Sequence, residues 1–340
     1  MDLKNLYYEI KSNLEKTDFS KLWCGFKPLK FALYTDDDCF FDGEYIEKND
    51  AFLANTSIFY DGEWIAIWYV QEAVDTTVLT SKIVHEMFHG FQQMNSESRF
   101  ADELDALYNY KYDEDNINLK LTENKLIYSL TENFDKEAFE KFLKIRRYRF
   151  DSFRYNYHYE SCIEQIEGAA NYVELQCLKQ LSGEAYEKKL SAMREAIVDL
   201  EGLLPIRVVC YDTGALLLHV MAENGIAFDS GFLSVPFAES VLDGIEGKRV
   251  DSEFSAKEML DSFNAEASKT VRMAIAKRDL VNDVECDLLA VNIYNAVFCE
   301  NHIISRYFVV FGSENERRVE YGDFVIESSA YKKATKIYRI

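Results

Sequence analysis

The residues most suited to a chemical role form a run from His85 to His89, which reads His-Glu-Met-Phe-His. Two histidines four positions apart on a helix lie one turn apart on the same face, so their imidazoles can converge on one metal ion. Glu86 stands beside the first histidine and could act as a base toward a water molecule on that ion. A catalytic zinc ion takes neutral nitrogen ligands and keeps one open position. The run therefore predicts a zinc site that still needs a third ligand.

The sequence around this run has the pattern of a buried helix. Apolar residues recur at helical spacing from Val78 to Phe91, and Asp75 and the two threonines after it are candidate N-caps. Gly90 follows the second histidine directly, and a glycine inside a helix often marks a close approach by another element. The alternative is that the two histidines are core residues bonded to backbone groups or water.

The third ligand must come from another segment. One class of zinc site has a glycine three residues, and a histidine or aspartate six residues, after the second histidine. That class is excluded here, because Gln92 and Asn95 stand at these positions. A site with a short spacer would need a glutamate where Tyr108 and Asn109 stand, so it is excluded as well. A ligand further along the chain is therefore expected.

Most other charged residues are predicted to have structural roles. Asp102, Glu103 and Asp105 are expected on the solvated face of a short helix. Glu160 and Glu164 are likewise expected on a solvated acidic face, although Glu164 remains an alternative third ligand. The basic run of residues 141–149 is expected to pair with acidic residues of the same chain.

The apolar helix expected over residues 160–178 contains a second motif. Its residues 167–174 read Glu-Gly-Ala-Ala-Asn-Tyr-Val-Glu, which resembles the Glu-Gly-Phe-Ala-x-Tyr-x-Glu segment of gluzincin metallopeptidases of the aminopeptidase N type. The resemblance implies that Glu167 is the third zinc ligand. The residue types agree, because small neighbours let this helix pack close to the helix of His85 and His89, and a carboxylate there is costly unless paired or bound to metal. Asn171 is either a partner of a ligand histidine or a surface amide.

A third segment, residues 211–215, reads Tyr-Asp-Thr-Gly-Ala. It resembles the Tyr-x-Lys-Gly-Ala segment of the same family, with Thr213 in place of the lysine. The resemblance implies that Tyr211 donates a hydrogen bond to the oxyanion of the tetrahedral intermediate. The alternative role of Tyr211 is packing at the start of a helix, and Arg207, one turn earlier, is expected at the surface.

The resemblance has limits that bear on specificity. The chain contains no Gly-x-Met-Glu-Asn segment, which that family uses to bind a free amino terminus. The linker between His89 and Glu167 is also longer than in that family, and residues 101–150 are expected to form inserted helices. The resemblance therefore implies zinc hydrolysis and does not imply aminopeptidase specificity.

Composition excludes several classes of partner. The 340 residues carry 38 basic and 59 acidic side chains, a formal net charge of −21, which disfavours nucleic acids and anionic membranes. The sequence shows neither the apolar core of a signal peptide nor a run long enough to span a bilayer. The seven cysteines are scattered without Cys-x-x-Cys pairs, so reduced thiols and a cytoplasmic location are expected.

The elements that must position these residues follow from the periodicity of the chain. Alternating segments in residues 28–72 predict a sheet, with a hairpin turn at Asp61-Gly62, directly before the active-site helix. The predicted fold class is α+β, with a zincin-like catalytic domain and a small antiparallel β unit at the C-terminal end. The predicted divisions are the sheet and active-site helix (1–96), a helical subdomain with the third ligand (97–280) and the β unit (281–340). The predicted strands of the first sheet are Phe31–Tyr34, Ala51–Tyr60 and Trp64–Val70.

These features together predict a cytoplasmic zinc-dependent metallohydrolase that acts on a peptide or protein substrate. His85, His89 and Glu167 are expected to bind zinc, Glu86 to act as general base and Tyr211 to stabilise the oxyanion. Two alternatives stay open. The first is a non-catalytic binding or regulatory protein on a zincin scaffold, and the second is a protease with one cytoplasmic target. The cleavage preference, exo- or endopeptidase action and the oligomeric state do not follow from the sequence.

Overall fold

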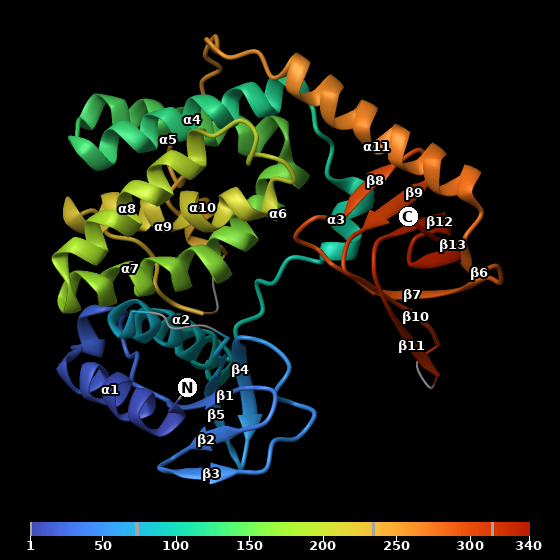
Figure 1. The fold of residues 1–340 in the computed structure, drawn as a ribbon. Helices are drawn as coiled ribbons and strands as arrows, with labels where there is room; N and C mark the ends of the chain where they lie inside the picture. The colour runs from blue at the N-terminus through green and yellow to red at the C-terminus, as the bar shows by residue number, and fades with distance from the viewer. Residues whose placement is uncertain (1, 72–74, 233–234, 314–315) are drawn as a thin grey trace.

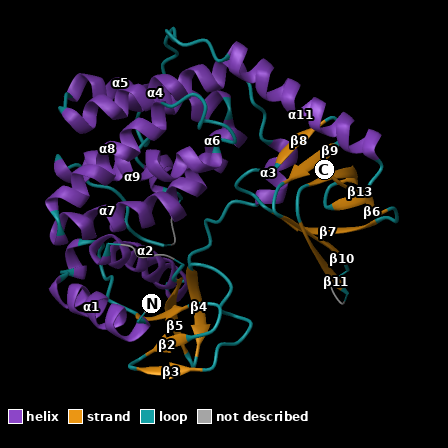
Figure 2. Cartoon of the chain, in the orientation of Figure 1, coloured by secondary structure: helices purple, strands orange, loops and turns teal. Residues whose placement is uncertain are grey.

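The computed structural model describes residues 2–71, 75–232, 235–313 and 316–340 (Figure 1). The first strands and the last strands form two separate sheets, and most helices form a stack between them in the chain (Figure 2). The predicted α+β class, with a mixed first sheet and an antiparallel second sheet, is confirmed. Among the described residues, none of the helices combines the length and the apolar character needed to cross a membrane.

The first sheet has five strands in the order β3-β2-β1-β5-β4. β1 and β5 run parallel and the other neighbouring strands run antiparallel. The strands are β1 (Lys30–Tyr34), β2 (Cys39–Phe41), β3 (Glu44–Ile46), β4 (Thr56–Tyr60) and β5 (Glu63–Tyr69). The sequence did not predict β2 and β3, because three residues are too few to show alternation.

The hairpin between β4 and β5 turns at the predicted position. Asp61 and Gly62 both have left-handed backbones, with φ of 49° and 85°, as a two-residue turn matched to the twist of the strands requires. β4 is an edge strand, so one side of it has no neighbouring strand in the sheet. It is shorter than predicted because Asn55 leaves the strand and accepts a hydrogen bond from the Tyr69 backbone at 2.7 Å.

The helices pack mainly around one core, which also takes in the inner face of the first sheet. Several begin at an aspartate or serine that caps the first turn; Asp75, for example, accepts from the Val78 backbone N–H at 3.0 Å, as predicted. The helices are α1 (Leu3–Lys16), α2 (Thr76–Met94), α3 (Glu103–Asn109), α4 (Glu114–Glu132), α5 (Lys136–Ser152), α6 (Arg154–Ile163), the π-helix η2 (Glu164–Gly168), α7 (Ala169–Leu181), α8 (Gly183–Val198), α9 (Arg207–Glu223), α10 (Phe237–Ser240) and α11 (Lys257–Lys277); a short 3₁₀ helix, η1 (Phe19–Lys21), follows α1.

The first sheet packs closely against α2, the helix that carries the two histidines. A methyl group on Gly90 would come within 2.6 Å of Leu29 Cδ1 and 3.5 Å of the Cβ atoms of Ser57 and Trp64. The predicted close approach at Gly90 is therefore confirmed, and it brings the β4–β5 hairpin beside His89.

The C-terminal sheet is larger than the small unit that the sequence predicted. Seven strands form a continuous sheet in the order β11-β10-β7-β13-β12-β9-β8, and an eighth, β6, pairs with β13. A left-handed pair at Glu300-Asn301 forms the tight turn between β8 and β9. The strands are β6 (Leu280–Asn282), β7 (Cys286–Val291), β8 (Val297–Cys299), β9 (His302–Ser305), β10 (Phe308–Gly312), β11 (Arg317–Tyr321), β12 (Phe324–Ala330) and β13 (Lys333–Arg339).

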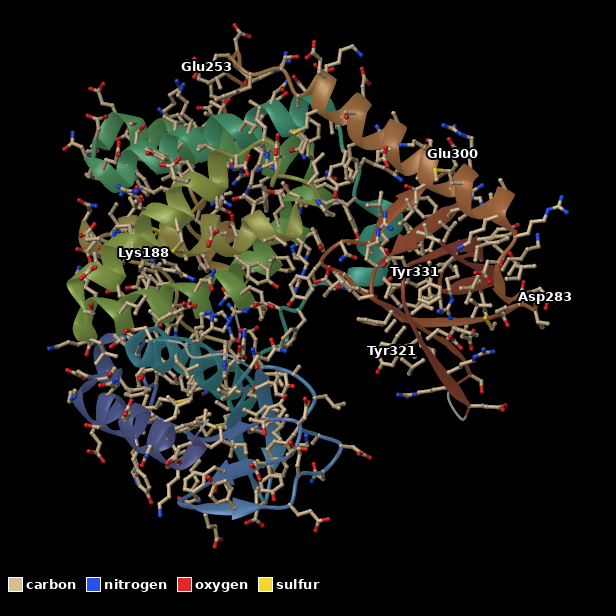
Figure 3. The ribbon with its side chains drawn as sticks, in the orientation of Figure 1. Lys188, Glu253, Asp283, Glu300, Tyr321 and Tyr331 are labelled. Atoms are coloured by element: carbon tan, nitrogen blue, oxygen red, sulfur yellow. The ribbon has the colours of Figure 1, made fainter. Side chains whose placement is uncertain are left out.

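Two helices attach this sheet to the rest of the chain. α11 lies along one face, where Val271 and Ala274 pack with Val325 (Figure 1). α3 contacts the sheet through Tyr108, whose ring centroid lies 4.9 Å from that of Phe298. Tyr331, which lies beside α3 in Figure 3, also donates a hydrogen bond to Asp102 at the start of that helix.

Candidate metal centre

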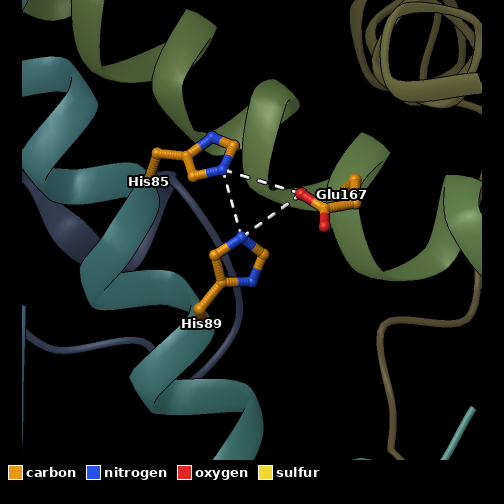
Figure 4. A group of neighbouring side chains, drawn as sticks. All are labelled: His85, His89 and Glu167. Carbon is orange, nitrogen blue, oxygen red and sulfur yellow. Dashed lines mark hydrogen bonds and ion pairs between the residues drawn. The ribbon is translucent and has the colours of Figure 1, made fainter. Parts of the chain in front are cut away.

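Two histidines of α2 and one glutamate of η2 form a compact group (Figure 4). The Nε2 atoms of His85 and His89 lie 3.1 Å apart, and Glu167 Oε2 lies 4.0 Å and 3.5 Å from them, respectively. Zinc bonds of about 2.0–2.1 Å at tetrahedral angles would place two ligand atoms about 3.3 Å apart. The three predicted ligands are therefore close enough together to bind one metal ion.

Hydrogen bonds orient the His89 ring. The Gln92 amide donates to the Ile166 carbonyl at 3.0 Å, so its oxygen faces His89 Nδ1 at 2.8 Å. That oxygen can only accept a hydrogen bond, so Nδ1 carries a proton and Nε2 is left to face the metal position. Gln92 was missed as a functional residue, although its position three residues after His89 on the same helix was a usable signal.

His85 has an acidic neighbour on its outer side. Its Nδ1 lies 3.4 Å from Glu174 Oε2, which is long for a hydrogen bond. Lys189 Nζ lies 3.1 Å from the other oxygen of Glu174, and the glutamate is nearly fully buried. A carboxylate behind a ligand histidine is a common arrangement in metal sites, because it fixes the ring. Glu174 is the last residue of the motif that contains Glu167, but no role was predicted for it.

Glu167 divides its two oxygens between different partners. Oε2 faces the histidines, whereas Oε1 accepts a hydrogen bond from Arg207 Nη2 at 3.2 Å. Arg207 also forms an ion pair with Glu103, which accepts from the Tyr159 hydroxyl at 2.8 Å. The predictions of a surface Arg207 and a solvated Glu103 are wrong. Arg207 contacts Glu103 of α3 and Glu167 of η2, and only 6% of this arginine is exposed.

The charges of the group depend on one another. Burial raises the pKa of Glu167, but the hydrogen bond and positive charge of His89, with the charges of His85 and Arg207, outweigh it and lower the pKa to about 2. Burial lowers the pKa of His89, but the hydrogen bond and negative charge of Glu167 outweigh it and raise the pKa to about 9. At neutral pH and without a metal, the two side chains therefore form an ion pair.

The two glycines of the second and third motifs meet at one helix crossing. A Cβ atom on Gly168 would lie 2.8 Å from Gly214 Cα, and one on Gly214 would lie 2.8 Å from Glu164 Cα. Glycine at both positions thus allows η2 and α9 to touch backbone to backbone. This contact brings Tyr211, at the start of α9, close to Glu167.

Glu164, the alternative third ligand, faces away from the histidines. It accepts hydrogen bonds from Arg146 Nη2 at 2.5 Å and from Thr213 Oγ1 at 2.7 Å, and it is fully buried. The wider π turn of η2 separates residues three apart by a larger angle than an α turn does. Glu164 and Glu167 consequently serve different clusters, and Glu164 is not part of the metal group.

The prediction that Glu160 and Glu164 are solvated is wrong for both residues. Glu160 is also fully buried, with Arg149 Nη2 at 2.6 Å and Lys120 Nζ at 3.1 Å. Since Arg146 and Arg149 belong to the basic run of α5, the predicted pairing of that run within the chain is confirmed for these two residues. The physical reason is that each buried carboxylate has a buried cation beside it, which offsets the cost of desolvation.

A pocket of about 570 Å³ opens over the metal group. Glu86 lines it beside His85 and His89, as do Tyr211 and Tyr294. The segment at the start of β4 and Trp64 of β5 also line it. The residues that line the pocket are Asn55, Thr56, Ser57, Trp64, His85, Glu86, His89, Gln92, Gln93, Phe100, Ala101, Glu103, Ile163, Ile166, Glu167, Arg207, Tyr211, Ile293 and Tyr294.

The Tyr211 hydroxyl is buried and has no hydrogen-bond partner of normal geometry among the described residues. Burial raises its pKa, and the charge of Glu167 raises it further, so the hydroxyl keeps its proton at neutral pH. The Arg207 guanidinium lies 5.3 Å from the centre of the Tyr211 ring. Tyr211 therefore brings a protonated hydroxyl to the wall of the pocket, with Tyr294 as its polar neighbour. Asn171, by contrast, bonds Asp212 at 3.2 Å and neither ligand histidine.

Comparisons with protein-family models, curated proteins and solved structures find no match for this chain. No family is therefore assigned to it. The structure shows a His-His-Glu group close enough to bind a metal ion, with a glutamate and a tyrosine in the same pocket.

Proposed function

We propose that the protein is a zinc-dependent peptidase of the gluzincin type. One observation carries the proposal, which is that His85 Nε2, His89 Nε2 and Glu167 Oε2 converge on one point while Glu86 lines the same pocket. Three protein ligands with an open fourth position are typical of catalytic zinc sites. The resemblance of the three sequence motifs to zincin metallopeptidases supports the same assignment.

The ligand set favours zinc over other common metals. Calcium and magnesium prefer all-oxygen sites, and two imidazoles do not suit them. Two histidines and a carboxylate also form iron(II) sites in oxygenases. A glutamate next to the first histidine, as in His85-Glu86, is what a zinc hydrolase requires and an oxygenase does not.

The side chains of the pocket supply the steps of peptide hydrolysis. Zinc, when bound, acts as a Lewis acid that activates water and polarises the substrate carbonyl. Glu86 accepts a proton from the attacking water and later transfers it to the leaving amine. Tyr211 donates a hydrogen bond to the oxygen that becomes negatively charged. Arg207 holds the second oxygen of Glu167 and so keeps the first directed at the metal.

The position of β4 favours a peptide over a small ester or amide. This edge strand begins at the wall of the pocket, where Asn55, Thr56 and Ser57 line it. The free edge of a strand can pair with an extended peptide through main-chain hydrogen bonds. A peptide paired there would pass over the metal group, so its backbone would be presented to Glu86.

Metal analysis together with a hydrolysis assay tests the proposal. Protein purified without chelator should contain one zinc per chain, and a peptide library should be cleaved in a chelator-sensitive way. His85→Ala should lose both zinc and hydrolysis, whereas His302→Ala, on β9 of the C-terminal sheet, should keep both. A metal-free wild-type protein that does not gain zinc on titration would contradict the proposal.

A further inference from the structure

A second cavity lies where the helical stack meets the C-terminal sheet. We call it the junction cavity; it has a volume of about 360 Å³. Helix α3, the segment after it, the start of α9 and the segment from β7 to β8 form its walls. The residues that line it are Glu103, Ala106, Leu107, Tyr110, Lys111, Tyr112, Asp113, Tyr159, Pro205, Ile206, Arg207, Asn264, Ile293, Ala296, Val297 and Phe298.

The junction cavity adjoins the pocket over the metal group. Glu103, Arg207 and Ile293 line both spaces. Arg207 also contacts Glu167, a member of the metal group, at 3.2 Å. The Arg207–Glu103 ion pair therefore lies at the boundary between the two spaces, next to the metal group.

Several polar groups of the junction cavity already have partners within the protein. The Tyr110 hydroxyl donates to Glu160 at 2.8 Å, and the Tyr159 hydroxyl donates to Glu103 at 2.8 Å. Lys111 donates to the Tyr108 carbonyl at 2.7 Å. These bonds hold the two tyrosines and Lys111 in place in the wall of the cavity.

Apolar and aromatic residues make up most of the lining of the junction cavity. The Tyr110 ring centre lies 5.1 Å from that of Tyr112 and 5.5 Å from that of Tyr159. Ring pairs at such distances offer faces and edges on which another ring packs favourably. Ile293 and Phe298, from the C-terminal unit, close the opposite side.

We propose that the junction cavity binds a large apolar side chain of the peptide substrate, with a preference for aromatic ones, from a residue near the cleaved bond. The proposal rests on the proposed peptidase function and names its substrate class. The C-terminal sheet then has a defined role, because the segment between β7 and β8 completes the binding site. Substrate selection is shared between the helical stack and this sheet.

A probe that needs no hydrolysis tests binding to the junction cavity itself. N-acetyl-4-fluorophenylalanine amide, followed by ¹⁹F NMR at millimolar concentration, should broaden on addition of the Glu86→Gln protein. N-acetylphenylalanine amide should compete, and N-acetylalanine amide should not. Ala106→Phe fills the cavity and should abolish the broadening, whereas Ala290→Phe, which lines a different depression beside β7, should not.

Cleavage of a proteome-derived peptide library tests whether the junction cavity selects substrates. We expect Phe, Tyr, Trp or Leu to be enriched at one fixed position near the cleaved bond. Ala106→Phe should lower kcat/KM for such peptides about 10- to 100-fold, since burial of a large apolar side chain contributes on that scale. Ala290→Phe should leave it unchanged. Phe298→Leu, a milder change in the wall, should shift the preference among apolar residues.

The two measurements separate this proposal from the proposed function. Probe binding that Ala106→Phe abolishes, in a protein without hydrolysis, would leave the cavity as a binding site and refute the peptidase. Hydrolysis with no apolar preference, or with equal effects of Ala106→Phe and Ala290→Phe, would refute the substrate site and leave the peptidase. Absence of probe binding to correctly folded Glu86→Gln protein would also refute the cavity proposal.

Discussion

Removal of the Arg207–Glu103 ion pair should weaken zinc binding without removal of any ligand. The informative variant is the double substitution Arg207→Met with Glu103→Gln, because it deletes one positive and one negative charge together. The net charge near the metal then stays the same, and Glu103 is not left as an unpaired buried carboxylate. What is lost at the metal group is the hydrogen bond to Glu167 Oε1.

The expected size of this effect follows from the geometry. A hydrogen bond to a charged group contributes about 1.5–3 kcal/mol, and the 3.2 Å distance between Arg207 Nη2 and Glu167 Oε1 is at the long end of the normal range. About 1.4–2.8 kcal/mol corresponds to a 10- to 100-fold increase in the dissociation constant. That range is typical of the loss of a side chain that orients a metal ligand.

Competition with a chromophoric chelator measures the zinc dissociation constant, and the visible spectrum of the cobalt(II) form reports the coordination. The released Glu167 oxygen can turn to the metal, so we expect weaker absorption from a higher coordination number. The control is Arg147→Met with Asp151→Asn, an ion pair at 3.0 Å on α5 that is partly exposed and does not line the pocket. Unchanged zinc affinity and an unchanged cobalt spectrum in the Arg207 variant would refute the reasoning.

Three further predictions follow from the same group. Glu167 raises the pKa of metal-free His89 to about 9, so zinc binding at pH 7 should release about one proton. The zinc affinity should also increase about tenfold per pH unit up to that pKa. Calorimetry in buffers of different ionisation enthalpy measures the released proton, and no release would show that the His89–Glu167 ion pair is absent. Gly168→Ala should lower the free energy of unfolding by about 1–3 kcal/mol and weaken zinc binding, because the new Cβ would meet Gly214 Cα at 2.8 Å. The control Gly183→Ala should change neither quantity, because no atom lies within 4 Å of its Cβ. Tyr211→Phe should keep zinc and lower kcat about 10²- to 10³-fold; an unchanged kcat would remove the tyrosine from the catalytic assignment.

Much of the metal group could be predicted because its pattern depends on residues that are close together in the sequence. The spacing of His85 and His89 is fixed by helix geometry. The small residues beside Glu167 predicted close packing against the helix of the two histidines, whereas Gly168 itself crosses α9 at Gly214. The Asp61-Gly62 turn likewise follows from two adjacent residues that tolerate a left-handed backbone.

The surroundings of the metal group could not be predicted, because they depend on contacts between distant segments. Arg207 and Glu103 are 104 positions apart, and nothing in either local pattern shows that they pair. Glu160 has the helical pattern of a solvated residue, and its burial is offset by Arg149 from α5 and Lys120 from α4. The size of the C-terminal sheet was underestimated for a related reason, since short strands show their pairing only in three dimensions.

The central claim is that zinc and Glu86 together hydrolyse peptide bonds. The most direct test compares turnover of a peptide library by wild-type and Glu86→Gln proteins that hold equal amounts of zinc. Glu132→Gln serves as a control, since that glutamate lies at the end of α4 and does not line the pocket. We predict hydrolysis by the wild type and the control, and loss of turnover with retained zinc in Glu86→Gln. Equal hydrolysis by Glu86→Gln, or a zinc-loaded wild type that cleaves no peptide, would contradict the account.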